Sequence, residues 1–297
     1  MNGGPWRPLK AHASTKKFFR GEYQGRSALM IRFASGANER NAFSELTSVL
    51  GKKGIPIPPV YFVPDNDEPY LITAFAQGKL LSKVADEASC LDAVIDSALK
   101  FGTVTKKIFS KDFPLRVMDR ARLRFEMDFF LLHFCAEYLD MEPSEELKNA
   151  LYRLAEEVDA LSKLFCHRDY HSENIITGKK GIFIVDYQDA LFAPRSYDLA
   201  SLYVDGYKDF EPWFRDSLPE IAEKKLRVSL IDFRKTALQR AVKALGTFGF
   251  QMVHRKKKRY MEAAVRTSAY VAELADGTTI ENKKALTFLK GLKKRLT

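Results

Sequence analysis

The stretch at residues 166–199 reads CHRDYHSENIITGKKGIFIVDYQDALFAPRSYDL, and the fold is best predicted outward from it. Two short apolar runs, at residues 175–177 and 182–185, flank a glycine-bounded turn at residues 178–181. Short apolar runs around such a turn are typical of a β-hairpin. A loop rich in polar side chains precedes the hairpin, and a helix start follows it. The stretch therefore predicts a hairpin that carries functional side chains at its open end.

Three side chains of this stretch suit phosphoryl transfer. Asp169 and Asn174 stand in the spacing H-x-D-x-x-x-x-N, and Asp186 ends the second apolar run. Phosphoryl transfer uses one carboxylate to orient and deprotonate the attacking hydroxyl, and oxygen ligands to hold Mg²⁺ on the phosphates. We expect Asp169 to be the base and Asn174 and Asp186 to be the metal ligands. The alternative, that each is an ordinary turn residue, does not explain why all three occur at these spacings.

The segments HRDYHSEN, IVDYQDA and PRSYDLA resemble the catalytic and metal-binding segments of the aminoglycoside phosphotransferase and choline kinase-like family. With the later LQRAVKALGTF, they are most similar to the bacterial kinases of cell-wall recycling, which phosphorylate the anomeric hydroxyl of N-acetylmuramate and N-acetylglucosamine. The resemblance implies a bilobal, protein-kinase-like α+β fold, with a small β-rich N-terminal lobe at residues 1–76 and a larger, mainly helical lobe at residues 77–297. It also implies ATP and Mg²⁺ as cofactors, and an amino sugar as the small-molecule acceptor.

The same resemblance suggests five further site residues around the loop. Gln188 and Asp189 mark the subgroup and are candidates to accept sugar hydroxyls, although Asp189 could instead cap a turn. Arg168 and His171 are secondary candidates, because His171 could bind a phosphate, orient Asp169 or hydrogen-bond only to the loop backbone. Asp198 is expected to begin a helix and to support the catalytic loop from a buried position. Arg122, Arg124, Arg240 and Arg255 are open alternatives for binding an acceptor carboxylate.

The nucleotide would be bound by residues 1–76 and by the segment that leaves them. A first hairpin is expected at residues 18–23 and 27–33, joined by a turn at Gln24-Gly25. The segment before this hairpin has no glycine, so Ser14, Thr15 and Lys16 are candidates to contact the ATP phosphates, although Lys16 could be an exposed strand-edge charge. Arg32 occupies the strand position where kinases place a lysine. Extended backbone at residues 73–78 is the expected hinge, where Ala74 and Ala76 would bind adenine through backbone groups.

Helices are expected at residues 38–52, 88–109, 118–139 and 145–164, with Ser144 as an N-cap of the last. The first should carry Glu39 and Glu45, possible partners for a strand-borne cation. His133 lies alone on an apolar helix stripe, which is more typical of a satisfied core histidine than of a metal ligand. From residue 210 onward the pattern is helical again. Pro212 and Pro219 are expected at helix starts, and Gly246 and Gly249 are expected to loosen a helix.

Composition limits the class of protein. The 297 residues are 46% hydrophobic, enough for a packed core, and no apolar run approaches the roughly 20 residues that span a bilayer. A cytoplasmic enzyme is therefore expected, and the three separated cysteines predict neither a disulfide framework nor a zinc site. Residues 223–297 hold 19 Lys plus Arg and 6 Asp plus Glu, a net charge of +13. Because the whole chain has a net charge of +10, residues 1–222 have a net charge of −3. We interpret this basic quarter as solvated helix faces rather than a nucleic-acid surface, since aromatic residues for base stacking are not interleaved.

Two alternatives remain open from the sequence. The first is a kinase with another acceptor, such as an aminoglycoside, choline or homoserine. The second is a pseudokinase whose basic surface binds a partner, which the missing glycine loop and strand lysine favour. The presence of Asp169, Asn174 and Asp186 favours an enzyme, because a chain used only for binding has no need of a base and metal ligands together. The sequence does not establish the oligomeric state or a preference for ATP over GTP.

Overall fold

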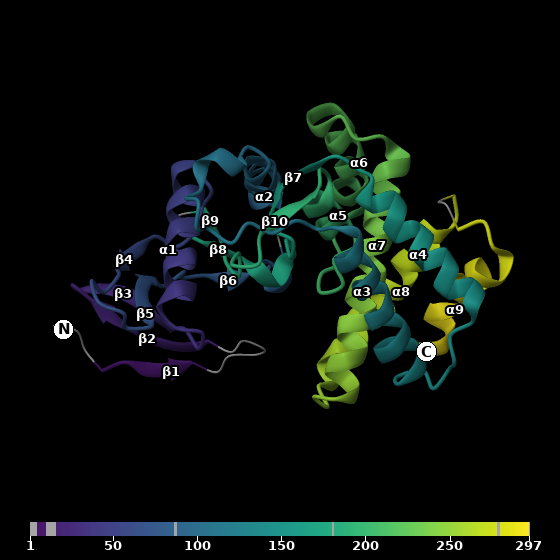
Figure 1. Ribbon diagram of the computed structural model, residues 1–297, viewed down its shortest axis with the longest axis horizontal. Helices are drawn as coiled ribbons and strands as arrows, with labels where there is room; N and C mark the ends of the chain where they lie inside the picture. The colour runs from purple at the N-terminus through teal and green to yellow at the C-terminus, as the bar shows by residue number, and fades with distance from the viewer. Residues whose placement is uncertain (1–4, 10–15, 86–87, 180, 278–279, 297) are drawn as a thin grey trace. The chain divides into compact units, whose positions relative to one another are not determined.

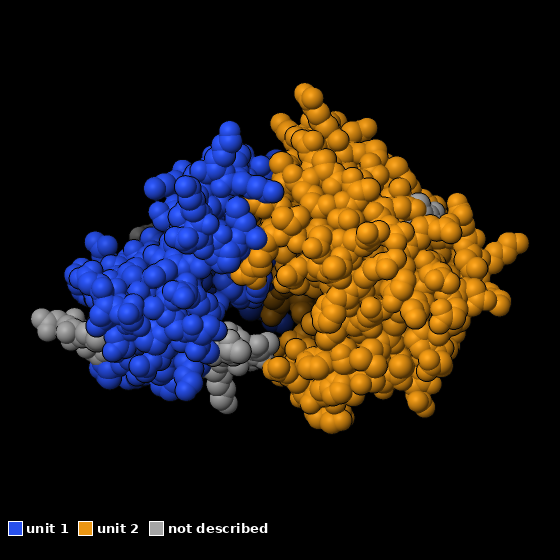
Figure 2. All heavy atoms as spheres, viewed as in Figure 1, with its two compact units in different colours: residues 1–115, 174–189 blue, residues 116–173, 190–297 orange. Residues whose placement is uncertain are grey.

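The structure is a computed structural model that describes residues 5–9, 16–85, 88–179, 181–277 and 280–296. The chain divides into two compact units (Figures 1 and 2). Unit 1 comprises Met1–Leu115 and Asn174–Asp189, and unit 2 comprises Arg116–Glu173 and Ala190–Thr297. Both contain strands and helices, so the mixed α+β composition expected from the sequence is confirmed. The lobe boundary after residue 76 stays a prediction.

Unit 1 is built on an antiparallel five-stranded sheet. Its strands, in spatial order, are β1 (Arg7–Leu9), β2 (Lys17–Tyr23), β3 (Arg26–Arg32), β5 (Tyr70–Ala74) and β4 (Val60–Phe62). Gln24 and Gly25 join β2 to β3 with φ of 50° and 72°, the positive values that a tight hairpin turn requires. Helix α1 (Ala37–Lys52) packs on one face, where the rings of Phe33 and Phe43 lie 5.6 Å apart. The other face buries Ala28 with aromatic side chains of neighbouring strands.

A second, three-stranded sheet in unit 1 contains the predicted hairpin. It consists of β6 (Lys79–Leu80), β8 (Ile175–Gly178) and β9 (Gly181–Ile184), and helix α2 (Ala88–Phe101) packs near β9. Gly78 has a φ of 155°, and a Cβ there would lie 2.1 Å from the carbonyl oxygen of Thr177. Only glycine allows the end of the predicted hinge to approach β8 this closely. The hinge and the hairpin are thus joined within one compact unit.

Unit 2 is mainly helical and is organised around the long helix α7. Its α-helices are α3 (Arg120–Phe130), α4 (Glu145–Asp159), α5 (Tyr197–Tyr203), α6 (Pro212–Leu226), α7 (Leu230–Val253), α8 (Met261–Ala275) and α9 (Lys283–Leu296). A π-helical turn, η3 (Leu131–Ala136), continues α3. Helix α7 packs against α3, α5, α8 and η3. Strands β7 (Lys163–Cys166) and β10 (Leu191–Pro194) form an antiparallel pair on either side of residues 167–190 in the sequence. Among the described residues, no helix has the length and apolarity to cross a membrane.

Several helix predictions need correction. The helix expected at residues 88–109 ends at Phe101, where Gly102 and a β-branched pair follow. The helix capped by Ser144 ends at Asp159 rather than Leu164, because residues 163–166 pair with β10 instead. The N-cap itself is confirmed, since Ser144 Oγ accepts from the Leu147 amide at 3.2 Å. The expected helix at residues 118–139 begins at Arg120 and passes into the π-helical turn.

Proline and glycine positions in the C-terminal part also differ from expectation. Pro212 begins α6 as predicted, but Pro219 lies inside that helix rather than at a start, and nothing in the structure explains its position. Helix α7 runs unbroken through Gly246 and Gly249. A Cβ at Gly246 would lie 2.9 Å from the Phe130 Cα, so the glycines serve close packing of α7 on α3 and η3 rather than loosening.

Candidate active site

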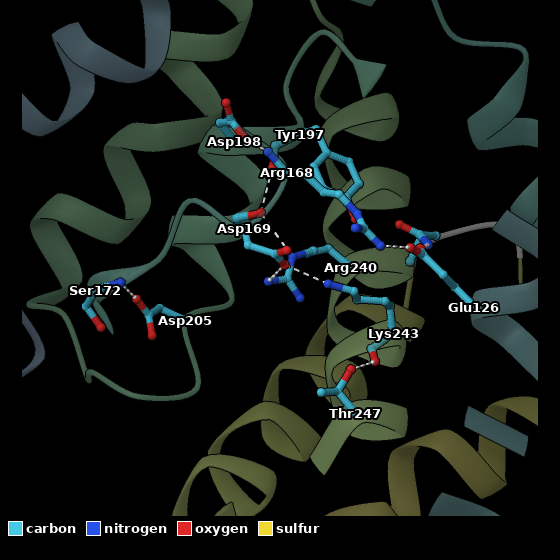
Figure 3. Close-up of polar contacts among 12 residues, drawn as sticks. Glu126, Arg168, Asp169, Ser172, Tyr197, Asp198, Asp205, Arg240, Lys243 and Thr247 are labelled. Carbon is cyan, nitrogen blue, oxygen red and sulfur yellow. Dashed lines mark hydrogen bonds and ion pairs between the residues drawn. The ribbon is translucent and has the colours of Figure 1, made fainter. Parts of the chain in front are cut away.

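Asp169 lies on the loop after β7 and is held by two cations from α7. Lys243 Nζ donates to Asp169 Oδ1 at 2.7 Å, and Arg240 Nη2 donates to the same oxygen at 3.3 Å. Both cationic side chains point toward the carboxylate from one face of α7 (Figure 3). The side chains are little exposed: 27% for Asp169, 14% for Lys243 and 7% for Arg240. The carboxylate is therefore fixed by charge-assisted bonds in a largely desolvated position.

Electrostatics keeps Asp169 ionised. Burial acts to raise its pKa, but Lys243, Arg240 and Arg168 outweigh burial and hold the pKa well below the usual 3.8. Burial, together with Arg240, lowers the pKa of Lys243, and Asp169 opposes this shift. A base with such a low pKa is weak, but it is fully available as a proton acceptor at neutral pH.

Two buried aspartates anchor the backbone of the loop. Asp198, in the first turn of α5, accepts from the amides of His167 at 2.7 Å and Arg168 at 3.0 Å. Asp205 accepts from the Ser172 amide at 2.6 Å (Figure 3). Burial raises the pKa of Asp198 to about 7, although the two amides favour its ionised form. The loop on both sides of Asp169 is thus tied to the helical unit.

The Arg168 side chain packs inside unit 2, where it is hydrogen-bonded, rather than pointing into solvent. Its guanidinium donates to Glu126 at 3.2 Å, and Gln239 donates to the other oxygen of Glu126 at 2.8 Å. Its backbone has a φ of 79°, a left-handed conformation that costs energy in a non-glycine residue. Such strain at a loop held by several buried bonds is typical of a functional site.

His171 is a neutral imidazole in this structure. Burial and the nearby Arg240 lower its pKa to about 3, so it carries no positive charge at neutral pH. Its ring packs 5.0 Å from that of Tyr207, and its backbone amide donates to the Asp169 carbonyl at 3.1 Å. The environment favours a structural position over the phosphate-binding alternative.

Asn174 and Asp186 lie on unit 1, at the open end of the β8–β9 hairpin. The Val185 amide donates to the Asn174 carbonyl at 3.0 Å, which continues the hairpin register and places both residues at the same end. Asp186 has a φ of 63°, and its Oδ1 accepts from Gln188 Nε2 at 2.7 Å. A carboxylate and an amide oxygen are hard ligands of the type that Mg²⁺ prefers. Asp189 is the last residue of the same segment of unit 1.

Of the predicted phosphate-side residues, Lys16 is buried and paired with α1. Its Nζ lies 3.6 Å from Glu39 Oε1 and 5.7 and 5.6 Å from the ring centroids of Phe33 and Phe43. The side chain is only 8% exposed, so the strand-edge alternative does not describe it. Ser14 and Thr15 lie outside the described residues.

Arg32 and the hinge have different surroundings. Arg32 shares its face of β3 with Met30 and lines a surface hollow with Phe62 and Asp65, on the face away from α1. The cation beside the α1 glutamate is therefore Lys16. At the predicted hinge, the Ala74 amide donates to the Pro59 carbonyl at 2.9 Å, and the Ala74 carbonyl accepts from Thr73 Oγ1 at 3.2 Å. The second lone pair of that carbonyl is the group of Ala74 that suits a base edge. Ala76 follows in a segment that is neither helix nor strand.

The model of the phosphotransferase enzyme family matches residues 5–238. The chain belongs to this family. An N-acetylmuramate/N-acetylglucosamine kinase from Pseudomonas aeruginosa is 25% identical to this chain over 295 residues, covering 91% of this chain and 86% of the relative. The Pseudomonas putida protein of the same name is 25% identical and covers 88% of this chain and 81% of that protein.

Solved structures of the phosphotransferase fold support the architecture. A thermostable mutant of an aminoglycoside phosphotransferase, in ternary complex with AMP-PNP and hygromycin B, has a TM-score of 0.63 at 17% identity and covers 93% of this chain and 96% of its own. Plasmodium vivax ethanolamine kinase has a TM-score of 0.58 at 12% identity, covering 89% of this chain and 80% of its own. These similarities confirm the protein-kinase-like α+β fold. The protein is accordingly a phosphotransferase enzyme.

Lys243, Asp205 and Glu126 are the residues of this phosphotransferase that sequence reasoning missed. The sequence suggests Arg240 only for an acceptor carboxylate, yet its guanidinium donates to Asp169 and to Ser201 Oγ, the latter at 3.1 Å. The sequence does contain an indication of this pairing. Arg240 and Lys243 are three residues apart, and the other residues at 240–246 are apolar or glycine. Buried cations at helical spacing imply a buried carboxylate partner.

Proposed function

We propose that this phosphotransferase transfers the γ-phosphoryl group of ATP to the anomeric hydroxyl of an amino sugar, either N-acetylmuramate or N-acetylglucosamine. Two curated relatives, each 25% identical over most of the chain, are named N-acetylmuramate/N-acetylglucosamine kinase, which supports this acceptor over others. The neighbours that act on aminoglycosides or ethanolamine are alike in fold only. The observation that carries the proposal is the ionised Asp169, fixed by Lys243 and Arg240 on an anchored loop.

In this proposal Asp169 orients the acceptor hydroxyl and accepts its proton late in the reaction. The transition state is loose, so positioning and charge neutralisation contribute more than basicity. A weak base suffices for an anomeric hydroxyl, which is more acidic than an ordinary alcohol. Asp198 and Arg168 would position the loop, and Asp198 would do so through the amides of His167 and Arg168.

Asn174 and Asp186 would hold Mg²⁺ through their side-chain oxygens. When bound, the ion would neutralise charge on the phosphate oxygens. Residues 1–76 would form the nucleotide lobe, with Lys16 near the phosphates and Ser14 and Thr15 beside it in sequence. The Ala74 carbonyl and the Ala76 amide would bind adenine. Gln188, which is hydrogen-bonded to Asp186, and Asp189 would bind acceptor hydroxyls. Arg32 would contact the nucleotide only at the surface of its lobe.

The test is a coupled ADP-release assay with Mg-ATP across N-acetylmuramate, N-acetylglucosamine, aminoglycosides, choline and homoserine, followed by phosphorus NMR of the product. Turnover with an amino sugar and a sugar 1-phosphate as product would support the proposal. Turnover confined to another acceptor, or phosphate on another hydroxyl, would refute it. Asp169→Asn serves as the control, because it should remove acceptor-dependent ADP release while nucleotide binding persists.

A further inference from the structure

A second cluster of chemically reactive side chains lies in unit 2, among residues that the proposed reaction does not use. His133 belongs to the π-helical turn η3, Glu137 follows it, and His254 caps the C-terminal end of α7. Glu137 Oε2 lies 2.7 Å from His133 Nδ1 and 2.7 Å from His254 Nε2. One such atom from each residue lies within 4.8 Å of the other two. Two imidazoles and one carboxylate therefore converge on one point, with His133 and Glu137 four residues apart and His254 117 residues after Glu137.

The cluster is held in place by its surroundings. The His133 ring packs edge-on against Phe129 and Phe250, with centroids 4.1 and 5.0 Å away. The ring of His254 lies 4.9 Å from that of Phe250. A Cβ at Gly249 would lie 2.4 Å from the His133 carbonyl oxygen, so a glycine is needed to bring α7 this close to η3. The rotamers and the helix contact that bring the three groups together are thus fixed by packing.

The charge of the cluster also suits a cation. Glu137 contributes a carboxylate whose Oε2 contacts both imidazole nitrogens, so the three ligand atoms face one another. Two imidazole nitrogens with one carboxylate oxygen form the ligand set of zinc and related divalent transition metals, whereas Mg²⁺ and Ca²⁺ favour oxygen ligands throughout. Bond lengths of about 2.0–2.1 Å in a tetrahedral site place ligand atoms roughly 3.3 Å apart, which small side-chain rotations here would reach.

Access distinguishes this cluster from a closed hydrogen-bond network. The side chain of His133 is 12% exposed, but those of Glu137 and His254 are 29% and 43% exposed. An ion can therefore enter from solvent, and a fourth position remains for water. The π-helical turn is a second indication, because such turns occur often at functional sites.

We infer that His133, Glu137 and His254 form a binding site for one divalent transition-metal ion of the zinc type, which would link η3 to the end of α7. This site would be separate in ligand chemistry from the proposed magnesium site on Asn174 and Asp186. Because the ion would bind only the folded arrangement, it would stabilise unit 2 in proportion to its free concentration.

The experiment uses the full-length chain without a histidine tag, stripped with a chelator and kept in millimolar Mg²⁺. Zinc is added in a calorimetric titration, and cobalt is added separately for its visible absorption. We expect one zinc per chain, a cobalt spectrum of a low-symmetry nitrogen and oxygen site, and a higher melting temperature with zinc. His254→Gln and Glu137→Gln should each weaken zinc binding at least about tenfold, since even supporting partners of metal ligands are worth that much.

His12→Gln is the matched control, because it removes a histidine that lies outside the described residues and away from the cluster in sequence. It should leave zinc affinity unchanged. The inference would be overturned if the wild-type chain bound no zinc at micromolar concentration, or if His254→Gln and Glu137→Gln bound it as tightly as wild type. Equal competition by Ca²⁺ would also overturn it. Metal-free melting curves of the variants show whether each one is folded, so a loss of binding can be assigned to the ligand.

Discussion

Lys243→Met tests whether α7 supplies the charge that fixes Asp169. The Nζ to Oδ1 distance of 2.7 Å and the small exposure of both side chains make this a partly buried pair. Removing one partner of a buried pair costs about 3–5 kcal/mol, because the remaining charge is left uncompensated. Here Arg240 stays beside the carboxylate at 3.3 Å, so we expect Lys243→Met to cost about 2 kcal/mol.

Asp169→Asn should cost more, about 3 kcal/mol, because it leaves both Lys243 and Arg240 without their carboxylate. If the two residues stabilise the fold through each other, Lys243→Met combined with Asp169→Asn should cost about 2 kcal/mol less than the sum of the single changes. Urea unfolding followed by fluorescence of Trp213, which lies in unit 2, measures the four free energies of unfolding. Costs that add to within about 0.5 kcal/mol would refute the pairing.

The same variants separate the charge role from the chemical role. Asp169→Asn should lower kcat about 10²–10⁴-fold, the range that a positioned base contributes. Lys243→Met retains the base and should lower kcat less. Lys243→Met should also raise the pKa of Asp169, because Lys243 is the cation that lowers this pKa most. We therefore expect the Asp169 limb of kcat/KM, measured in an Asp198→Asn background that removes the limb near pH 7, to move to higher pH. An unmoved acid limb would show that Lys243 does not control the ionisation of Asp169.

Three further predictions concern other parts of the chain. Asp186→Asn introduces a side chain that tolerates the positive φ of 63° but is a weaker metal ligand. We expect kcat/KM for Mg-ATP, measured by varying ATP, to fall about 10²-fold or more. An unchanged kcat/KM would contradict the assignment of Asp186 as a metal ligand. Burial raises the pKa of Asp198 to about 7, and its protonation weakens the hydrogen bonds that it accepts from two loop amides, so activity should fall below neutral pH. Asp198→Asn should be less active and should lose this pH dependence. If the variant kept the fall in activity below neutral pH, that fall would belong to another group. Gly78→Ala should lower the free energy of unfolding by more than about 2 kcal/mol, because its Cβ would lie 2.1 Å from a carbonyl oxygen. Gly277→Ala, whose nearest atom is 4.0 Å away, should cost only about 1 kcal/mol, and equal costs would show that φ alone matters.

Elements with strong local signals could be predicted from the sequence. The β2–β3 hairpin and its Gln24–Gly25 turn, helix α1 and the β8–β9 hairpin all occur within a residue or two of the expected positions. The helix has its own apolar periodicity, and each hairpin has turn residues that fix the register of its strands. The helix start at Asp198 also follows from local pattern, since α5 begins at Tyr197.

Short strands formed by distant pairing could not be predicted in the same way. Strands β7 and β10 have four residues each and are separated by the whole catalytic stretch. Leu161 and Leu164 continue the apolar spacing of α4, so the pattern favoured a longer helix. Pairing with Leu191–Pro194 outweighs that local preference, because it satisfies the backbone groups at residues 163–166 within a buried sheet.

The candidate site shows the same limit at the level of single residues. Asp169 could be identified from its motif, but its partners lie 71 and 74 residues further along the chain. Lys16 rather than Arg32 is the partner of α1 because Lys16, which directly precedes β2, is directed toward α1, whereas Arg32 lies on the face of β3 away from that helix. A one-residue change of register reverses that face, and the sequence around residue 15 offers no periodicity that fixes it.

The charges around Asp169 bear on which acceptor the enzyme can use. A carboxylate held by Lys243 and Arg240 is ionised across the neutral range but weakly basic, so it can orient a hydroxyl better than it can remove a proton. With a loose transition state, that limitation matters least when the acceptor hydroxyl is itself acidic. An anomeric hydroxyl meets this condition better than the primary alcohol of choline. The electrostatics of unit 2 and the names of the curated relatives therefore both support the proposed acceptor.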